Sequence, residues 1–157
     1  MGLVVNKPSP DVSLAGMLEQ LGIVEGGGPI RLPSALRHKP VFSGGPVEPA
    51  RGFVLHSSDY FLPAGTLPVN SDISLTATLD ILQSMVRGEG PRKSLLALGY
   101  AGWSPGQLEA EIQMNGWLVC DADEDILFSL PPEEKYHAAL KSMGITPGQL
   151  SPDAGHA

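Results

Sequence analysis

The sequence predicts an α+β fold built on a mixed, strongly bent sheet. Apolar runs typical of strands alternate with segments of helical periodicity, but without the regular strand–helix–strand units of a parallel sheet. Glycine (19) and proline (15) together make 34 of the 157 residues, which indicates many turns between short elements. A chain of this length suits a single domain that buries its core without disulfide or metal support.

The first half of the chain is expected to hold short strands and one short helix. Strands are expected at residues 2–6, at 41–49, where the strand ends in a turn, and at 52–58. A weaker pattern at 66–70 and 72–75 indicates another strand or a hairpin, and a turn is expected at 6–11 and a loop at 25–29. Ser13 can cap a helix over 14–21 that Gly22 closes.

The second half is expected to alternate helices and strands. Apolar residues recur at helical spacing over 78–87, and Gly88 follows them. The apolar run 94–101 predicts a strand that is buried on both faces. The remaining expected elements are a helix after Trp103, a strand over 117–122 and a helix from 131 to 144.

The composition is acidic, with a formal net charge of -7. Residues 107–134 hold eight acidic side chains and no Lys or Arg, which indicates a solvated face or, alternatively, an acidic protein-binding surface. Direct nucleic-acid binding is not expected, because phosphate backbones favour clustered basic residues. No apolar run approaches the length of a membrane span, so no membrane partner is expected. With one cysteine and no leader sequence, the cytoplasm is the expected location.

Residues 102–106 read GWSPG, which matches the G-x-S-x-G pattern around a nucleophilic serine. A nucleophile elbow uses the backbone N–H of the next residue to bind the oxyanion, but Pro105 has no N–H. Ser104, Pro105 and Gln107 instead match the N-cap, N1 and N3 positions of a capping box. We therefore interpret Ser104 as a structural cap rather than a nucleophile, and the sequence assigns no catalytic residue.

Residues 43–46 read SGGP, and two interpretations of this glycine pair stay open. It predicts a turn that needs a positive φ at Gly44 or Gly45. It could also form a ligand loop to which Arg51 contributes charge, although the spacing of known phosphate-binding loops is absent.

His56 lies beside Ser57 and Asp59, but neighbouring strand residues point to opposite faces and cannot form a triad among themselves. A hydrogen-bonded histidine at a strand end is the plainer interpretation, and a general base is the alternative. The other histidines, at 38, 137 and 156, show no metal-ligand spacing, so we expect neither metal nor cofactor. Cys120 is expected to be half-buried in a strand, and its redox role stays open.

The chain contains six distinctive segments: GLVVNKP, VFSGGPVEPARGFVLH, LGYAGWSPGQLEAEI, NGWLV, ILFSLPPEEKYHAALKSMGI and LSPDAGHA. In their order and amino-acid sequence, these segments together resemble the YqgE/AlgH family of bacterial proteins. The resemblance implies a compact α+β fold whose bent, partly barrel-like sheet is surrounded by helices. It implies little chemistry, and one branch is described as a transcriptional regulator of exopolysaccharide production without a recognised DNA-binding motif. The family pattern near residue 104 rests on Gly99, Tyr100, Trp103 and 106–108, and does not require a serine.

The resemblance also bears on the two ends of the chain. Family members carry a further segment before GLVVN, so we expect residues 1–157 to be one domain that lacks this segment, with Met1 matching an internal methionine and 151–157 forming a tail. A sheet edge left open in this way would favour a homo-oligomer.

The function expected from the sequence is that of a non-enzymatic cytoplasmic domain that binds an unknown protein or small ligand, with an indirect role in transcriptional regulation. Its expected binding surface combines Gly44, Gly45, Arg51 and His56. The alternative is an enzyme or nucleotide binder that uses the loop Ser43–Pro46 with Arg51, and His56 as general base.

Overall fold

The computed structural model describes residues 1–24 and 32–150. Within these ranges the strands are β1 (Pro8–Ser13), β2 (Pro40–Ser43), β3 (Val47–Ser57), β4 (Thr66–Pro68), β5 (Ile73–Thr76) and β6 (Ser94–Tyr100). The helices are α1 (Leu14–Gln20), α2 (Ser34–Arg37), α3 (Leu79–Arg87), α4 (Gln107–Gln113), α5 (Glu124–Phe128) and α6 (Pro132–Ser142), followed by a 3-10 turn at Pro147–Gln149. The predicted loop at 25–29, the predicted tail at 151–157 and His156 within that tail lie outside the described residues.

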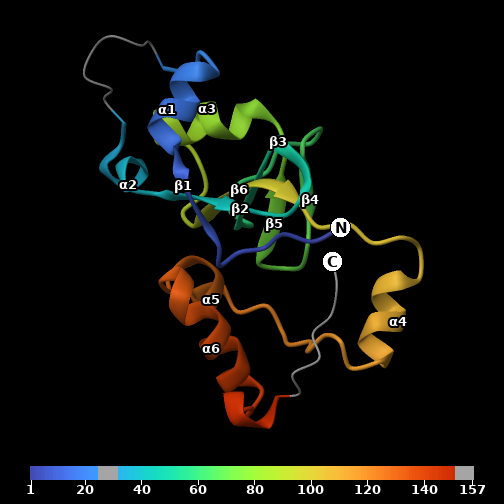
Figure 1. The fold of residues 1–157 in the computed structure, drawn as a ribbon. Coiled ribbons are helices and arrows are strands. Elements are labelled where there is room, and N and C mark those ends of the chain that lie inside the picture. The colour runs from blue at the N-terminus through green and yellow to red at the C-terminus, as the bar shows by residue number, and fades with distance from the viewer. Residues whose placement is uncertain (25–31, 151–157) are drawn as a thin grey trace.

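The six strands form one mixed sheet in the order β1-β2-β6-β3-β5-β4. β2 and β6 run parallel, and the other neighbours run antiparallel. The register shifts within β1–β2 and between Val47 and Gly52 of β3, and such irregularities increase local bending. The predicted α+β fold with a mixed sheet surrounded by helices is therefore confirmed, and the sheet is open rather than closed into a barrel (Figure 1).

Helices cover both faces of this sheet, with α1, α2 and α3 on one side and α5 and α6 on the other (Figure 1). The strand register sorts the side chains between the two layers. Val41, Leu96 and Val54 lie in register and belong to the core under α1 and α3. One residue further along β2 and β6, Phe42 and Ala97 face the second core, which the N-terminal segment and Phe128 of α5 cover. Because β6 serves both cores, the prediction of a strand buried on both faces is confirmed.

Three local signals for a helix end or a turn are confirmed. Ser13 caps α1, with its hydroxyl accepting the Gly16 N–H at 3.0 Å. α3 ends at Gly88 in the left-handed conformation (φ 77°), as glycine allows. β4 and β5 form the predicted hairpin.

Three predicted elements are wrong. Residues 2–6 form no strand: besides packing on the second core, they make an isolated bridge between Gly2 and Ala101 and a bond from the Val4 N–H to the Gly44 oxygen (2.8 Å). Part of the predicted turn at 6–11 belongs to β1. Residues 117–122 are also not a strand, because they pair with no strand of the described chain. In addition, α5 was not predicted from the sequence. Asp123 caps this helix, and its carboxylate accepts the N–H groups of Asp125 (2.8 Å) and Ile126 (3.0 Å).

α4 projects from the body of the molecule (Figure 1). Two tryptophans, one before and one after this helix, contact it through Glu111. The Trp103 and Trp117 rings meet edge-on at 5.8 Å between centroids. Oε2 of Glu111 accepts both indole N–H groups, at 3.3 Å from Trp103 and 2.6 Å from Trp117. Both tryptophans are therefore packing residues that join the segments on either side of α4.

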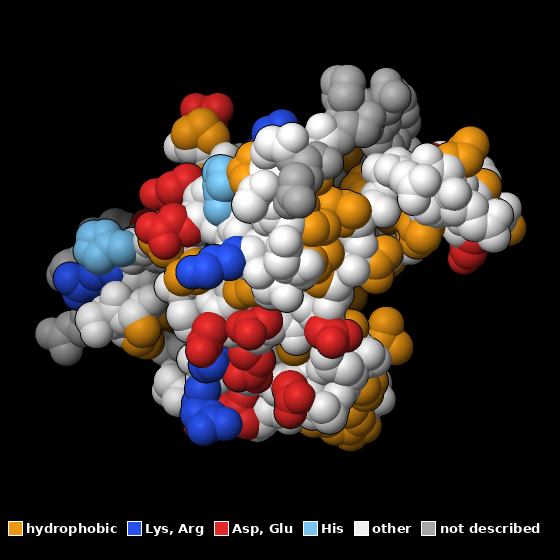
Figure 2. Space-filling model, turned by 90° about the horizontal axis from the view of Figure 1, so that it is seen from below, with side chains coloured by type: hydrophobic (Ala, Val, Ile, Leu, Met, Phe, Trp, Pro, Cys, Tyr) orange, Lys and Arg blue, Asp and Glu red, His pale blue; other side chains and the backbone are white. Residues whose placement is uncertain are grey.

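The face that carries α5 and α6 has mixed chemistry. Figure 2 shows acidic side chains gathered in groups on this face, with hydrophobic side chains exposed beside them. The most exposed large hydrophobic residues of the region after α4 are Met114 (74%) and Val119 (70%).

Candidate functional site

A cleft of about 520 Å³ lies between α1, β3 and the start of α3. Its floor is the sheet, contributed by Val54 of β3, Leu96 and Leu98 of β6, and Thr76 of β5. Its walls are residues 11–21 around α1 and residues 77–82 at the start of α3. Apolar side chains make most of the lining, which is typical of sites for small molecules.

The hydroxyl groups that line the cleft differ in their partners. The Ser13 hydroxyl caps α1, and Thr76 Oγ1 is bonded to His56 Nε2 (2.9 Å) and Thr66 Oγ1 (2.7 Å). Thr78 Oγ1 is buried and has no hydrogen-bond partner within the described residues. Thr78 precedes α3, where a threonine hydroxyl usually caps the helix, but here it makes no capping bond. Thr78 therefore places beside the cleft one buried polar group whose hydrogen-bonding capacity is unused.

Gly52 keeps the cleft open. A Cβ atom at this position would lie 3.9 Å from Leu98 Cδ2 and 4.0 Å from Leu96 Cδ1, which is ordinary van der Waals contact. A side chain at this position would therefore fit, and a large one would enter the space that the cleft now occupies. Neither Gly52 nor Thr78 was singled out from the sequence, because a strand glycine and a threonine before a helix are both common without a ligand.

The SGGP turn serves backbone packing rather than the cleft. A Cβ atom at Gly44 would collide with the Gly99 carbonyl oxygen, and one at Gly45 would collide with the Tyr100 backbone. Gly45 has a φ of 155°, so the predicted need for a positive φ at this pair is met. The Gly44 N–H donates to the Leu98 oxygen at 2.7 Å, which joins the turn to β6. Glycine is required here because two backbone segments approach closely.

Arg51 and His56 are not brought together with this turn. Arg51 lines the cleft, pairs with Glu48 at 3.2 Å and lies 5.3 Å over the Phe53 ring. His56 has no exposed surface (0%), because its side chain points inward from β3. It therefore cannot contact a ligand at the protein surface, and its place in the expected binding surface is wrong. Arg51 is thus the member of the expected surface that lines the cleft.

The hydrogen bonds of His56 assign its tautomer. Nδ1 lies 2.8 Å from the Ser57 carbonyl oxygen, which can only accept, so Nδ1 carries the proton. Nε2 then accepts from the Thr76 hydroxyl. Burial lowers the pKa of His56 and outweighs the opposing effects of the Ser57 carbonyl and the Asp59 carboxylate. The interpretation of His56 as a hydrogen-bonded strand histidine fits this arrangement.

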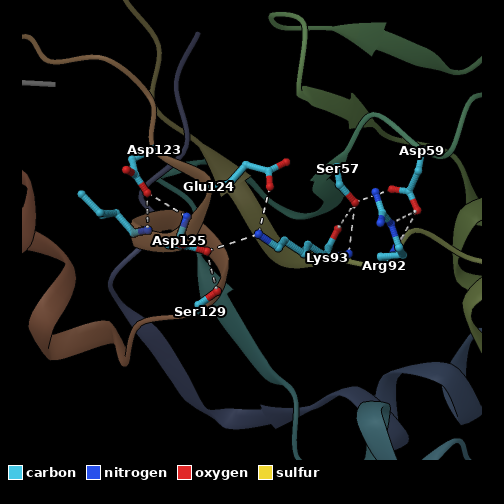
Figure 3. Close-up of polar contacts among 9 residues, drawn as sticks. Ser57, Asp59, Arg92, Lys93, Asp123, Glu124, Asp125 and Ser129 are labelled. Atoms are coloured by element: carbon cyan, nitrogen blue, oxygen red, sulfur yellow. Dashed lines mark hydrogen bonds and ion pairs between the residues drawn. The ribbon is translucent and has the colours of Figure 1, made fainter.

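Ser57 and Asp59 belong to a polar network that ties β3 to the start of β6 and to α5 (Figure 3). The Ser57 hydroxyl donates to Asp59, whose Oδ2 accepts the backbone N–H (3.1 Å) and Nε (3.2 Å) of Arg92. Burial acts to raise the pKa of Asp59, but these hydrogen bonds outweigh it and the pKa lies below its ordinary value. Lys93 then reaches across to Glu124 (2.9 Å) and Asp125 (3.3 Å) of α5. Since the Ser57 hydroxyl bonds Asp59 and not His56, the network connects elements and forms no triad.

The capping assignment at Ser104 needs a correction. α4 begins at Gln107, after Gly106 in the left-handed conformation (φ 79°), so Ser104 is not its N-cap. The Gln107 side chain does accept the Ser104 N–H (3.0 Å), and the Gln107 N–H donates to the Ser104 carbonyl (3.0 Å). Pro105 and Gly106 therefore form a closed turn before the helix, because a left-handed residue cannot continue as α-helix.

Cys120 is exposed and lies in the irregular segment after Trp117, so the expected half-buried strand position is wrong. In the described part of the chain, no group of three or more His, Cys, Asp or Glu residues could hold a metal ion. Within residues 1–24 and 32–150, no helix combines the length and apolar character needed to cross a membrane.

A family model described as AlgH-like matches residues 1–148. A UPF0301 protein from Rhodopseudomonas palustris (strain HaA2) is 55% identical over 157 residues, which cover all of this chain and 72% of that protein. A second UPF0301 protein, from Afipia carboxidovorans, is 54% identical and is covered over 75% of its length.

Solved structures agree with these matches. The solution structure of the AlgH protein from Pseudomonas aeruginosa has a TM-score of 0.74 and 45% identity, covering all of this chain and 79% of that one. The crystal structure of a protein from Corynebacterium diphtheriae has a TM-score of 0.64 at 15% identity, over 96% of this chain and 71% of that one. The second likeness shows a shared fold alone.

Proposed function

Since the chain belongs to the AlgH-like family, we propose that it is a non-enzymatic binding module that takes a small, largely apolar molecule into the cleft between α1, β3 and α3. One observation carries the proposal. An apolar cleft of about 520 Å³ is built on the central strands, and it is lined by Thr78, whose buried hydroxyl has no hydrogen-bond partner among the described residues.

The size and chemistry of the cleft support this class of ligand. Pockets for small molecules commonly span about 300–1,000 Å³, and they combine an apolar lining with few polar groups. An unpaired buried hydroxyl costs about 1–3 kcal/mol, and a ligand that bonds to it would recover this cost. The expected ligand therefore has a hydrocarbon body and one neutral hydrogen-bonding group.

We further propose that the module acts in the cytoplasm and affects transcription indirectly, through its ligand or a partner protein. Its formal net charge of -7 disfavours direct contact with DNA. His56 is poorly placed for the alternative role of general base, because it is wholly buried and both of its ring nitrogens are bonded.

The test is a titration of the isotope-labelled protein with 1-octanol, followed by NMR amide shifts. We expect saturable shifts at Ala77, Thr78 and Leu82, and their loss in Gly52→Leu, which fills the cleft. Gly148→Leu is the matched control, because its Cβ atom would also meet open space, away from the cleft. Thr78→Val should weaken octanol about fivefold while leaving octane unchanged. Binding that Gly52→Leu leaves intact would place the ligand elsewhere and overturn the proposal.

A further inference from the structure

Lys135 of α6 is a buried lysine on the other side of the sheet, with 5% of its surface exposed. Its Nζ donates to the carbonyl oxygens of Val5 (3.0 Å) and Leu127 (2.7 Å), and it lies 4.8 Å from the centre of the Phe42 ring. No carboxylate of the described chain forms an ion pair with it. A buried lysine normally forms an ion pair with a carboxylate, and this ammonium group has no such anionic partner among the described residues.

The third N–H of this ammonium group has no acceptor atom among the described residues. An ammonium group carries three donors, and the Val5 and Leu127 carbonyls take two of them. Burial lowers the pKa of Lys135, as expected for a cation held only by carbonyl dipoles and an aromatic face. A bound anion would satisfy the remaining donor and the charge together.

A second cavity, of about 290 Å³, lies beside Lys135. Its apolar walls come from α5 and α6, through Ile126, Leu127 and Ala139. Asp121 and Asp123 also line it, but the Asp123 carboxylate is bonded to the first N–H groups of α5. The cavity thus has a buried cation, a hydrocarbon wall and an acidic rim.

We propose that this second cavity binds a small aliphatic monocarboxylate, whose carboxylate pairs with Lys135 and whose hydrocarbon part lies along α5 and α6. The small volume and the apolar wall select a short chain. The rim acids select against a dicarboxylate, because its second charge would lie near Asp121 and Asp123. This site is separate from the cleft under α1 and α3, so either proposal can fail while the other holds.

The experiment is a calorimetric and NMR titration of the whole chain with sodium hexanoate at neutral pH. We expect hexanoate to bind at least about tenfold more tightly than 1-hexanol, adipate or hexylamine, because the carboxylate makes a charge-assisted hydrogen bond. The amide shifts should centre on Leu127, Tyr136 and Ala139 and leave Thr78 unaffected.

Variants separate the roles of charge and space. Lys135→Met should weaken hexanoate about tenfold or more without changing 1-hexanol, and Lys141→Met, an exposed lysine of the same helix, should change neither. Ala139→Phe should block the cavity while keeping Lys135, which tests the site even if Lys135→Met fails to fold. Hexanoate that does not bind the native chain, or that binds Ala139→Phe as well as the native chain, would overturn the proposal.

Discussion

The imidazole of His56 and the hydroxyl of Thr76 lie 2.9 Å apart between two neighbouring strands, and the bond between them is one link of a directed chain. Thr66 accepts the Leu62 N–H (3.0 Å), and its hydroxyl lies 2.7 Å from that of Thr76. Since His56 Nε2 accepts from Thr76, the Thr66 hydroxyl donates to Thr76. The chain joins β3, β4 and β5 beneath the floor of the cleft.

His56 makes stability depend on pH in a defined direction. Its pKa is lowered from the ordinary 6.5, so the native state stays neutral where the unfolded chain already binds a proton. The contribution of His56 to stability is therefore present above about pH 6.5 and is lost as the pH falls below it toward the lowered pKa, with a loss of at most about 2 kcal/mol by about pH 5. Urea unfolding at both pH values measures this.

The variant His56→Gln should show a smaller loss between these pH values, whatever its stability at neutral pH. His137→Gln, at an exposed position of α6, should keep the full loss. An identical pH dependence in His56→Gln and the native chain would contradict the assignment.

The glycines of the sheet should differ sharply in their tolerance of a methyl group. Gly45→Ala should lower the free energy of unfolding by at least about 2 kcal/mol, because its Cβ would collide with the Tyr100 backbone and its φ is 155°. Gly52→Ala should be neutral or stabilise by up to about 1 kcal/mol, since its Cβ meets only leucine methyls at 3.9–4.0 Å. Equilibrium urea unfolding of both variants is the measurement, and equal effects would refute this account of the turn.

Glu111 should control the position of α4 through its two indole contacts. Glu111→Ala removes the acceptor of both Trp103 and Trp117, so we expect a red shift of the tryptophan emission and a local cost of about 1–2 kcal/mol. Faster amide exchange confined to α4 would measure that cost. Glu109→Ala, an exposed acid of the same helix, is the control. Unchanged emission in Glu111→Ala would mean that the tryptophans pack without the carboxylate.

Much of the local structure could be predicted because its causes lie within a few residues. The cap at Ser13, the left-handed glycine after α3 and the apolar run of β6 each depend on neighbours in the sequence. The prediction of a strand over 117–122 was wrong because it depends on distant residues. The apolar residues of this segment suit a strand, but a strand also needs a partner at a sheet edge. The prediction of Ser104 as the N-cap of α4 was wrong because Gly106 adopts a left-handed φ, so the helix begins only after Gly106.

The two candidate sites could not be predicted from sequence patterns, because their residues come together only in the tertiary structure. Thr76, Thr78 and Gly52 become one cleft only through the pairing of β3 with β5 and β6 and the packing of α1 and α3 over them. In the sequence, nothing distinguishes Lys135 from an ordinary exposed lysine of a helix. Its burial depends on Val5, 130 residues away, whose carbonyl oxygen accepts a hydrogen bond from its amine.

By itself, the sequence determined the fold class, the family and the elements whose ends are set by caps and glycines, because these signals are local or are shared along the whole chain. The tertiary structure alone decided that His56 is buried, that Gly44 and Gly45 pack against Gly99 and Tyr100, and that a hydroxyl and an ammonium group are left incompletely paired beside two cavities. Burial and pairing depend on which distant segments meet, and the strand order and register of the sheet set those meetings.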